Sequence, residues 1–379
     1  KKFDQINLDK TGFSYRASDI KNRIEICNLQ DKKSMDLAIK RITDYHKKQM
    51  PNNFTWQDKE GVELGWAWKP VDRVGVYVPG GIASYPSSAI MNIVPAKVAG
   101  VKDIVLTSPI SNAGYNPLMI YAAYSLNVSK ILTLGGAQAI AALAFGTESI
   151  KKVDKITGPG NEYVAEAKRQ VFGKVGIDSV AGPSEVLLIS DKSMPKEIAA
   201  IDLLSQAEHD EKAQSILITN DEEYALEVEK EIDSRLKKLK RQRIAQSSWK
   251  NFGAIVVVPN FEVAIDISNF IAPEHLQLCF FNAESYIDSI NNAGSVFLGY
   301  WSPEAMGDYI TGSNHVLPTN GTARFSSSLS VYDFLKRVSV TKLNKRSFEK
   351  LAHHVIRLAD TEGLEAHSLS VSERLKHFK

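Results

Sequence analysis

Three short stretches of the sequence gather residue types that do chemistry in proteins. The first is Gln206-Ala-Glu-His209-Asp210, which closes a stretch of helical pattern that begins near Lys196. Gln206 and His209 are three positions apart, so on a continuous helix they share one face. An imidazole and an amide oxygen can bind zinc, which accepts mixed nitrogen and oxygen ligands. A purely structural histidine at a helix end is the alternative.

The second stretch places Glu274 beside His275, between a helical pattern and a strand pattern. A carboxylate and an imidazole at the mouth of a strand are candidate general bases near neutral pH. Neighbouring side chains on a regular strand point in opposite directions, so joint action requires an irregular backbone here. Pro273 biases the residue before it away from helix. The alternative is a helix that ends at the proline and stabilises His275 through its dipole.

The third stretch, residues 302–319, mixes glycines with polar side chains that include Asp308 and His315. This composition directly after a strand pattern is typical of a rigid binding loop. A network of side-chain turns would give the same composition. We interpret His315 and Cys279 as structural.

Glycine-rich segments follow three strand patterns in the first half of the chain, at residues 79–81, 135–138 and 158–161. Ligands of α/β proteins bind at the carboxyl ends of strands, where helix N-termini favour phosphates. None of the segments has the GxGxxG spacing of the dinucleotide fingerprint. Their recurrence at strand ends favours a ligand over unrelated structural turns.

The elements that must position these residues alternate along the chain. Strand patterns occur at 74–78, 104–107, 131–134, 153–157, near 177, 186–190, 215–219, 254–258, 276–280 and 295–298. Helical patterns separate them, which predicts an α/β fold with parallel sheets. We expect two similar Rossmann-like domains, each an incomplete, doubly wound parallel sheet, with small helical segments at both ends of the chain.

These patterns also predict where the parts begin and end. The expected parts are an N-terminal helical segment (1–76) that joins the second α/β domain, a first domain (77–185), a second domain (186–330) and a C-terminal helical tail (331–379).

Composition argues against several classes of protein. The 379 residues carry 46 Lys and Arg against 44 Asp and Glu, and a net charge of +2 is too weak to indicate nucleic-acid or membrane partners. The basic run at 234–243 follows acidic residues and contains no aromatic residue, which favours a solvated helix face over a nucleic-acid patch. Two cysteines, no visible signal peptide and no apolar stretch of about 18 residues predict a cytoplasmic protein.

From about residue 15 onward the sequence resembles the histidinol dehydrogenases. The segments that carry the resemblance are 73–81, 135–148, 153–161, 181–186, 202–210, 273–276, 307–309 and 314–319. The resemblance implies an NAD-dependent, zinc-containing enzyme that oxidises L-histidinol through L-histidinaldehyde to L-histidine. These are the final steps of histidine biosynthesis, and they reduce two NAD per turnover.

The resemblance also implies roles for individual residues of this sequence. The catalytic pair is Glu274 and His275. One zinc per subunit falls on Gln206, His209, Asp308 and His367. Substrate contacts fall on the zinc ligands, His275, Ser184 and Glu362, and NAD contacts fall on Tyr77, Gln138 and Asn161.

The position of Glu362 and His367 in the C-terminal tail predicts a shared active site. A tail of this size cannot hold a core of its own, so it must dock on another surface. The resemblance implies a homodimer in which the tail is swapped onto the partner and completes the partner's site.

Three other functions are alternatives for the same residues. A related dehydrogenase acting on a sulfonated propanediol would lack the acid that faces the imidazole, and Glu362 is present. A non-catalytic descendant would be expected to have lost Glu274, His275 or a metal ligand. Zinc, His and Glu also make metal-dependent hydrolases, so without the resemblance a hydrolase would remain open.

Overall fold

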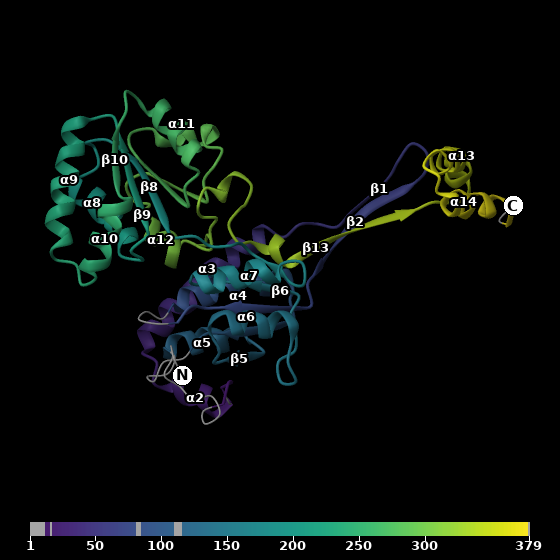
Figure 1. Ribbon diagram of the computed structural model, residues 1–379, viewed down its shortest axis with the longest axis horizontal. Helices are drawn as coiled ribbons and strands as arrows, with labels where there is room; N and C mark the ends of the chain where they lie inside the picture. The colour runs from purple at the N-terminus through teal and green to yellow at the C-terminus, as the bar shows by residue number, and fades with distance from the viewer. Residues whose placement is uncertain (1–11, 16, 81–84, 110–115, 378–379) are drawn as a thin grey trace. The chain divides into compact units, whose positions relative to one another are not determined.

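A computed structural model describes residues 12–15, 17–80, 85–109 and 116–377 (Figure 1). The chain divides into two compact units, one of residues 1–49 and 71–334 and the other of residues 50–70 and 335–379. Gly81, in the first glycine-rich segment, lies outside the described residues. Within those residues no helix has both the length and the apolar character needed to cross a membrane.

The first expected α/β domain forms as a five-stranded parallel sheet of order β5-β4-β3-β6-β7. Asn116 and Asn161 cap two of its helices by accepting backbone N–H groups, as good N-cap residues do. Its strands are β3 (Arg73–Tyr77), β4 (Asp103–Thr107), β5 (Lys130–Leu132), β6 (Lys155–Thr157) and β7 (Gly176–Ile177), and its helices are α4 (Pro86–Ala99), α5 (Pro117–Ser125), α6 (Gly136–Phe145) and α7 (Glu162–Val171).

The second α/β domain is also a five-stranded parallel sheet, of order β10-β9-β8-β11-β12. Its central strand β8 is almost wholly buried, as expected for a parallel sheet covered on both faces. The strands are β8 (Glu185–Ser190), β9 (Gln214–Thr219), β10 (Ala254–Val257), β11 (His275–Cys279) and β12 (Ser295–Leu298). The helices are α8 (Lys196–Ala207), α9 (Glu222–Leu236), α10 (Gln242–Phe252), α11 (Phe261–Ile271), the 3₁₀ turn η1 (Ala283–Ser289) and α12 (Glu304–Tyr309).

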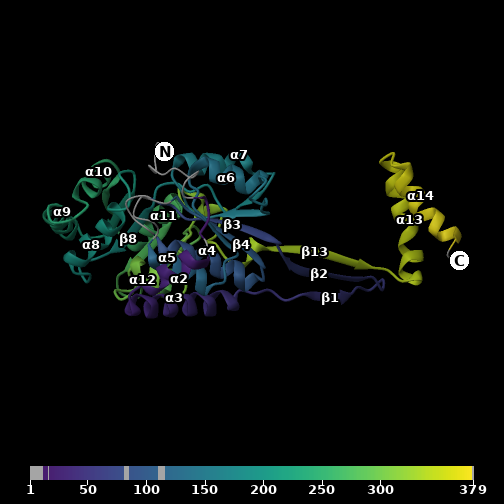
Figure 2. The same ribbon diagram turned by 90° about the horizontal axis from the view of Figure 1, so that it is seen from below.

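The N-terminal helices pack differently from expectation. They are α2 (Ala17–Glu25) and α3 (Leu29–Lys48), and α3 runs beside α4 of the first α/β domain (Figure 2). Met35, Ala38 and Ile42 recur at helical spacing and bury against Ile90 and its neighbours on α4. The segment therefore packs mainly on the first domain and not, as expected, on the second.

The second unit adds strands to the helical segments expected at both ends of the chain. Residues 50–70 and 335–342 form an antiparallel sheet of order β1-β2-β13, because alternating aromatic and β-branched residues favour strands. Its strands are β1 (Phe54–Gln57), β2 (Glu63–Pro70) and β13 (Leu335–Lys342). Two helices follow, α13 (Lys345–Thr361) and α14 (Glu365–His377), and the 3₁₀ turns η2 (Thr322–Arg324) and η3 (Val331–Phe334) precede β13 in the first unit.

A buried polar contact ties α3 to the segment that follows α12. Asn314 Nδ2 donates to the Met91 carbonyl (2.7 Å) and lies 3.3 Å from Nε2 of the buried His46. An amide nitrogen only donates, so His46 accepts at Nε2 and donates from Nδ1 to Gln49 Oε1 (2.7 Å). The ring is therefore neutral, and its burial lowers the pKa of His46.

We expect His46 to make the fold sensitive to acid. The folded chain favours the neutral ring, whereas the unfolded ring takes up a proton near its ordinary pKa of about 6.5. The free energy of unfolding should therefore fall as the pH drops below that value, by up to about 1.4 kcal/mol per pH unit. Urea unfolding of the wild type and His46→Gln between neutral pH and pH of about 5 measures the effect. If the free energy of unfolding depends on pH equally in the two proteins, the role of His46 is refuted. His377→Gln, at an exposed position, serves as the control.

Candidate active site

His275 opens strand β11 in the middle of the second sheet, between Val186 of β8 and Ser295 of β12. The chain reaches it through Ala272, which ends α11 in the left-handed conformation (φ +56°), and Pro273. This bend places Glu274 Oε2 3.6 Å from His275 Nδ1, although the two residues are adjacent. The irregular backbone that joint action requires is therefore present.

Hydrogen bonding fixes which nitrogen of His275 can act as a base. Nδ1 lies 2.9 Å from the backbone carbonyl oxygen of Glu185, and a carbonyl only accepts. Nδ1 therefore carries the proton, and the lone pair of the neutral ring is on Nε2. Nε2 is buried, has no hydrogen-bond partner among the described residues, and lies 3.6 Å from Asp308 Oδ1. The base nitrogen is thus aimed at Asp308.

Glu274 is held in place by a reciprocal exchange with Glu185. Its Oε2 accepts the Glu185 backbone N–H (2.8 Å), and Glu185 Oε2 accepts the Glu274 backbone N–H (3.2 Å). Glu185 Oε1 also accepts the N–H of Asn320. Burial raises the pKa of Glu274 to about 8. A carboxyl group that titrates near neutral pH suits proton transfer.

Glu304 is a buried acid of this site that the sequence analysis missed. Its Oε1 accepts from Ser205 Oγ (2.9 Å), and its Oε2 lies 3.9 Å from His275 Nδ1 without a hydrogen-bond partner in the described part of the chain. Burial raises the pKa of Glu304 to about 7. Glu304 lies four residues before Asp308, so the two acids share one face of α12. This spacing was the signal in the sequence that could have identified Glu304 as a residue of the site.

The acids around His275 favour its charged form. Burial acts to lower the pKa of His275, but the carboxylates of Glu274, Asp308 and Glu304 outweigh burial and raise it. An imidazolium formed by taking a proton from a substrate is therefore stabilised.

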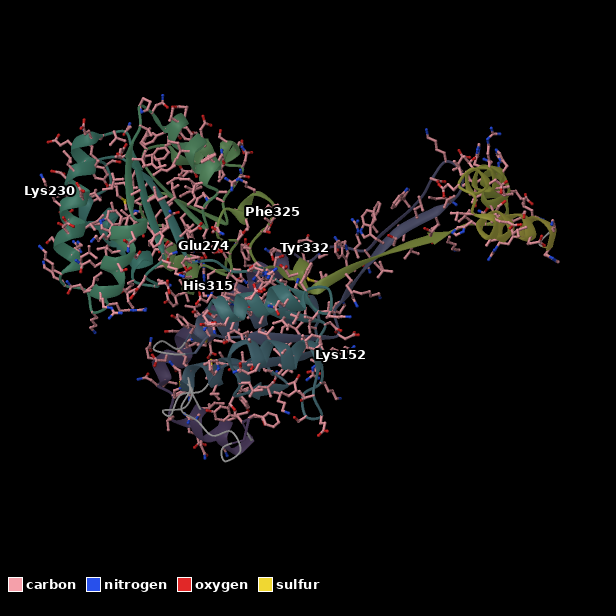
Figure 3. All side chains as sticks on the ribbon, viewed as in Figure 1. Lys152, Lys230, Glu274, His315, Phe325 and Tyr332 are labelled. Atoms are coloured by element: carbon pink, nitrogen blue, oxygen red, sulfur yellow. The ribbon has the colours of Figure 1, made fainter. Side chains whose placement is uncertain are left out.

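The expected metal ligands of the first unit, Gln206, His209 and Asp308, come from two helices and a turn. Gln206, on α8, is buried with Nε2 3.3 Å from His275 Nδ1, and Asp308, on α12, reaches the other ring nitrogen. His209 does not share a continuous helix face with Gln206, because α8 ends at Ala207 and His209 follows in a turn. His315, labelled in Figure 3, has Nδ1 3.0 Å from the Asp308 carbonyl oxygen, so it holds the backbone beside this acid.

The donor types of Gln206, His209 and Asp308 fit zinc, which accepts amide oxygen, imidazole nitrogen and carboxylate oxygen. Over the described ranges no group of three or more His, Cys, Asp and Glu side chains is arranged to hold a metal ion. The remaining expected ligand, His367, is exposed on α14 of the second unit, and Glu362 ends α13 there.

The expected NAD contacts follow strands of the first sheet. Tyr77 is the last residue of β3, and its hydroxyl oxygen accepts the N–H of Gly136 (3.1 Å) at the start of α6. Gln138 is exposed in the first turn of α6, and Asn161 caps α7. All three residues therefore lie at the carboxyl edge of their sheet, where α/β proteins bind nucleotides. Ser184 directly precedes β8 in the other sheet and is half-buried.

Comparison with known proteins places this arrangement in a family. The family model described as histidinol dehydrogenase matches residues 1–375. Histidinol dehydrogenase of Cereibacter sphaeroides is 49% identical over 374 residues, which are 99% of this chain and 86% of the relative. Histidinol dehydrogenase 1 of Nostoc sp. is 51% identical over 353 residues, 93% of this chain and 82% of the relative.

Solved structures agree with the sequence comparison. A crystal structure of histidinol dehydrogenase from Elizabethkingia anophelis matches with a TM-score of 0.94 and 39% identity, covering 100% of this chain and 87% of that one. An acetylating aldehyde dehydrogenase from Geobacillus thermoglucosidasius, at 12% identity and a TM-score of 0.51 over 86% of this chain and 97% of that one, shares the fold alone. The match along the sequence and the agreement of the folds lead to one conclusion: this chain belongs to the histidinol dehydrogenase family of oxidoreductases.

Proposed function

We propose that this chain is an NAD-dependent, zinc-containing enzyme that oxidises L-histidinol to L-histidine in two steps through L-histidinaldehyde. The observation that carries the proposal is the geometry of His275. Its Nδ1 faces the Glu185 carbonyl, its Nε2 has no hydrogen-bond partner among the described residues, and Glu274 Oε2 lies 3.6 Å from Nδ1. Two successive oxidations require one base that takes the proton of the alcohol and then that of the hydrate. They also require a second acid–base group that activates the water which adds to the aldehyde.

The residues of this chain handle the protons of both oxidations. His275 accepts the proton of the alcohol at Nε2 in the first oxidation. Glu274 takes a proton from the water that adds to the aldehyde, and His275 accepts a proton from the resulting hydrate in the second oxidation. When bound, NAD accepts the hydride of each oxidation, and zinc orients the substrate. The nearby carboxylates stabilise His275 each time it becomes charged.

Two sets of residues support the cofactor part of the proposal. Tyr77, Gln138 and Asn161, at the strand ends of the first sheet, are the groups that would hold NAD. Gln206, His209 and Asp308, with His367 as the fourth ligand, would hold zinc. We propose further that His367 and Glu362 reach the site from the partner subunit of a homodimer.

One assay tests the activity directly. Purified protein with NAD and L-histidinol should form NADH, two per histidinol consumed, whereas a sulfonated propanediol should give none. The absorbance of NADH and the yield of histidine are measured together. NADH formation from the sulfonated diol alone would refute the proposed substrate.

We predict that His275 and Glu274 divide the two oxidations. His275→Asn should slow both steps by about 10²- to 10⁴-fold, because the same base serves each of them. Glu274→Gln should spare the alcohol step and slow the aldehyde step, because only the aldehyde must be hydrated. Single-turnover rates from histidinol and from histidinaldehyde separate the steps, with the exposed Glu284→Gln as the control. An equal fall of both rates in Glu274→Gln would contradict this division.

A second prediction concerns removal of zinc. A chelator should abolish activity, and added zinc should restore it, without unfolding the chain. A fold with two buried sheet cores does not depend on one metal ion as a zinc finger does. Far-UV circular dichroism before and after chelation measures this, and a collapse of the helical signal would show that the metal maintains the fold.

The shared site predicts complementation between two inactive chains. His275→Asn and His367→Ala, each inactive alone, should regain activity when mixed, because one of the two sites in a hybrid dimer has both histidines. Random exchange makes about half of the dimers hybrid, so activity should approach about a quarter of the wild-type value. Mass spectrometry confirms that subunits exchange. No recovery despite exchange would mean that each chain supplies its own His367.

A further inference from the structure

The glycine-rich segment after β6 turns through a backbone position that only glycine can occupy. Gly158 has φ +112°, and a Cβ there would lie 1.9 Å from the backbone oxygen of Tyr77. Gly160 is confined too, since its Cβ would lie 2.4 Å from Val164 Cγ1. The segment therefore lies directly against the end of β3, which carries Tyr77.

A buried ion pair holds both backbone polar groups of Gly158. Lys168 on α7 and Asp178 after β7 form the pair, and their side chains are only 2% and 5% exposed. Lys168 Nζ donates to the Gly158 carbonyl (3.0 Å), and Asp178 Oδ2 accepts the Gly158 N–H (2.7 Å). The second oxygen of Asp178 accepts from Lys168. The lysine and the aspartate thus bind the carbonyl and the N–H of the same residue.

Stability alone is a weak reason for such a pair. Removing two charges from water costs several kcal/mol each, and well-packed apolar residues in the place of a buried pair often leave stability unchanged or higher. What a charged pair adds is direction, because charge-assisted hydrogen bonds are short and oriented. Here that direction is imposed on the peptide groups of Gly158.

The segment so fixed carries one of the expected NAD contacts. Asn161, three residues after Gly158, uses Oδ1 to accept the N–H of Val164 and cap α7. Its amide nitrogen is then the group that can donate to a ligand. We propose that Lys168 and Asp178 are positioning residues for NAD, which set the path of residues 158–161 and with it the place of Asn161. This inference rests on the proposed use of NAD.

Paired substitutions test the inference without leaving a buried charge unpaired. Lys168→Met/Asp178→Leu removes both side-chain hydrogen bonds to the backbone of Gly158. Lys168→Met/Asp178→Asn returns one of them, because the amide oxygen of asparagine can still accept the Gly158 N–H. The matched control is Arg73→Met/Asp103→Leu, which removes an ion pair at the opposite, amino edge of the same sheet.

The expected result is a selective loss of affinity for NAD. In Lys168→Met/Asp178→Leu the KM for NAD should rise by about 10- to 100-fold, as when supporting residues behind a ligand site are removed. The KM for histidinol and kcat at saturating NAD should stay within about twofold. Lys168→Met/Asp178→Asn should recover part of the affinity, and the control pair should leave the KM for NAD unchanged. Binding of NADH, followed by its fluorescence, should show the same order.

The possible failures are distinguishable. If the wild type forms NADH and the KM for NAD is the same in all variants, the positioning role is wrong. If kcat falls, the KM values for NAD and for histidinol rise to a similar extent and the melting temperature drops, then the pair is purely structural. That result would also overturn the positioning role. If the wild type forms no NADH from histidinol and binds none, the proposed function fails, and the cofactor role of the pair falls with it.

Discussion

The hydrogen bond from His275 Nδ1 to the Glu185 carbonyl is the interaction on which the catalytic geometry depends. It joins the first residue of β11 to the first residue of β8, its neighbour in the sheet, so the ring is oriented by the register of two parallel strands. A backbone carbonyl cannot donate, so this contact places the proton of the neutral ring on Nδ1. The sheet thus determines which nitrogen is free, and the loops only bring partners to it.

The same register explains why Glu185 holds the residues of the site through three different groups. Its carbonyl accepts from His275, its N–H donates to Glu274, and its carboxylate accepts the N–H groups of Glu274 and Asn320. Residues before and inside β11, at the start of β8 and in the loop after Asn314 are therefore tied to one another by contacts that each join a backbone group to the side chain of Glu185, Glu274 or His275.

The alternation of strands and helices could be predicted because buried parallel strands are continuous apolar runs bounded by helices. All five strands of each sheet lie where the sequence pattern placed them. The strands of the second unit could not be predicted in the same way. They are short or exposed, and β2 pairs with β13, a partner far away in the sequence. The packing of α3 on α4 was missed because an apolar stripe shows that a helix is buried, but not against what.

The candidate site also divides into residues that could be predicted from the sequence and residues that only the structure reveals. Glu274, His275, Gln206 and Asp308 were found because each lies in a segment of unusual composition, and the structure brings them around one imidazole. Glu304 and the Lys168–Asp178 pair were missed because ordinary residues become unusual only when tertiary packing buries them. Burial of an acid or a lysine is a property of the fold, and local sequence does not encode it.

The pairing of β2 with β13 has a consequence for synthesis of the chain. Pro70 pairs with Leu335, so after Pro70 the ribosome must add 265 residues (335 − 70) before this partner exists. At roughly 5–20 residues per second, that delay is on the order of 10–50 seconds. Throughout it one edge of β2 lacks its partner, and Phe54 and Trp56 on β1 are exposed even in the finished fold. The nascent chain therefore carries an unpaired strand edge for most of its translation, and such an edge is open to pairing with other chains until β13 is made.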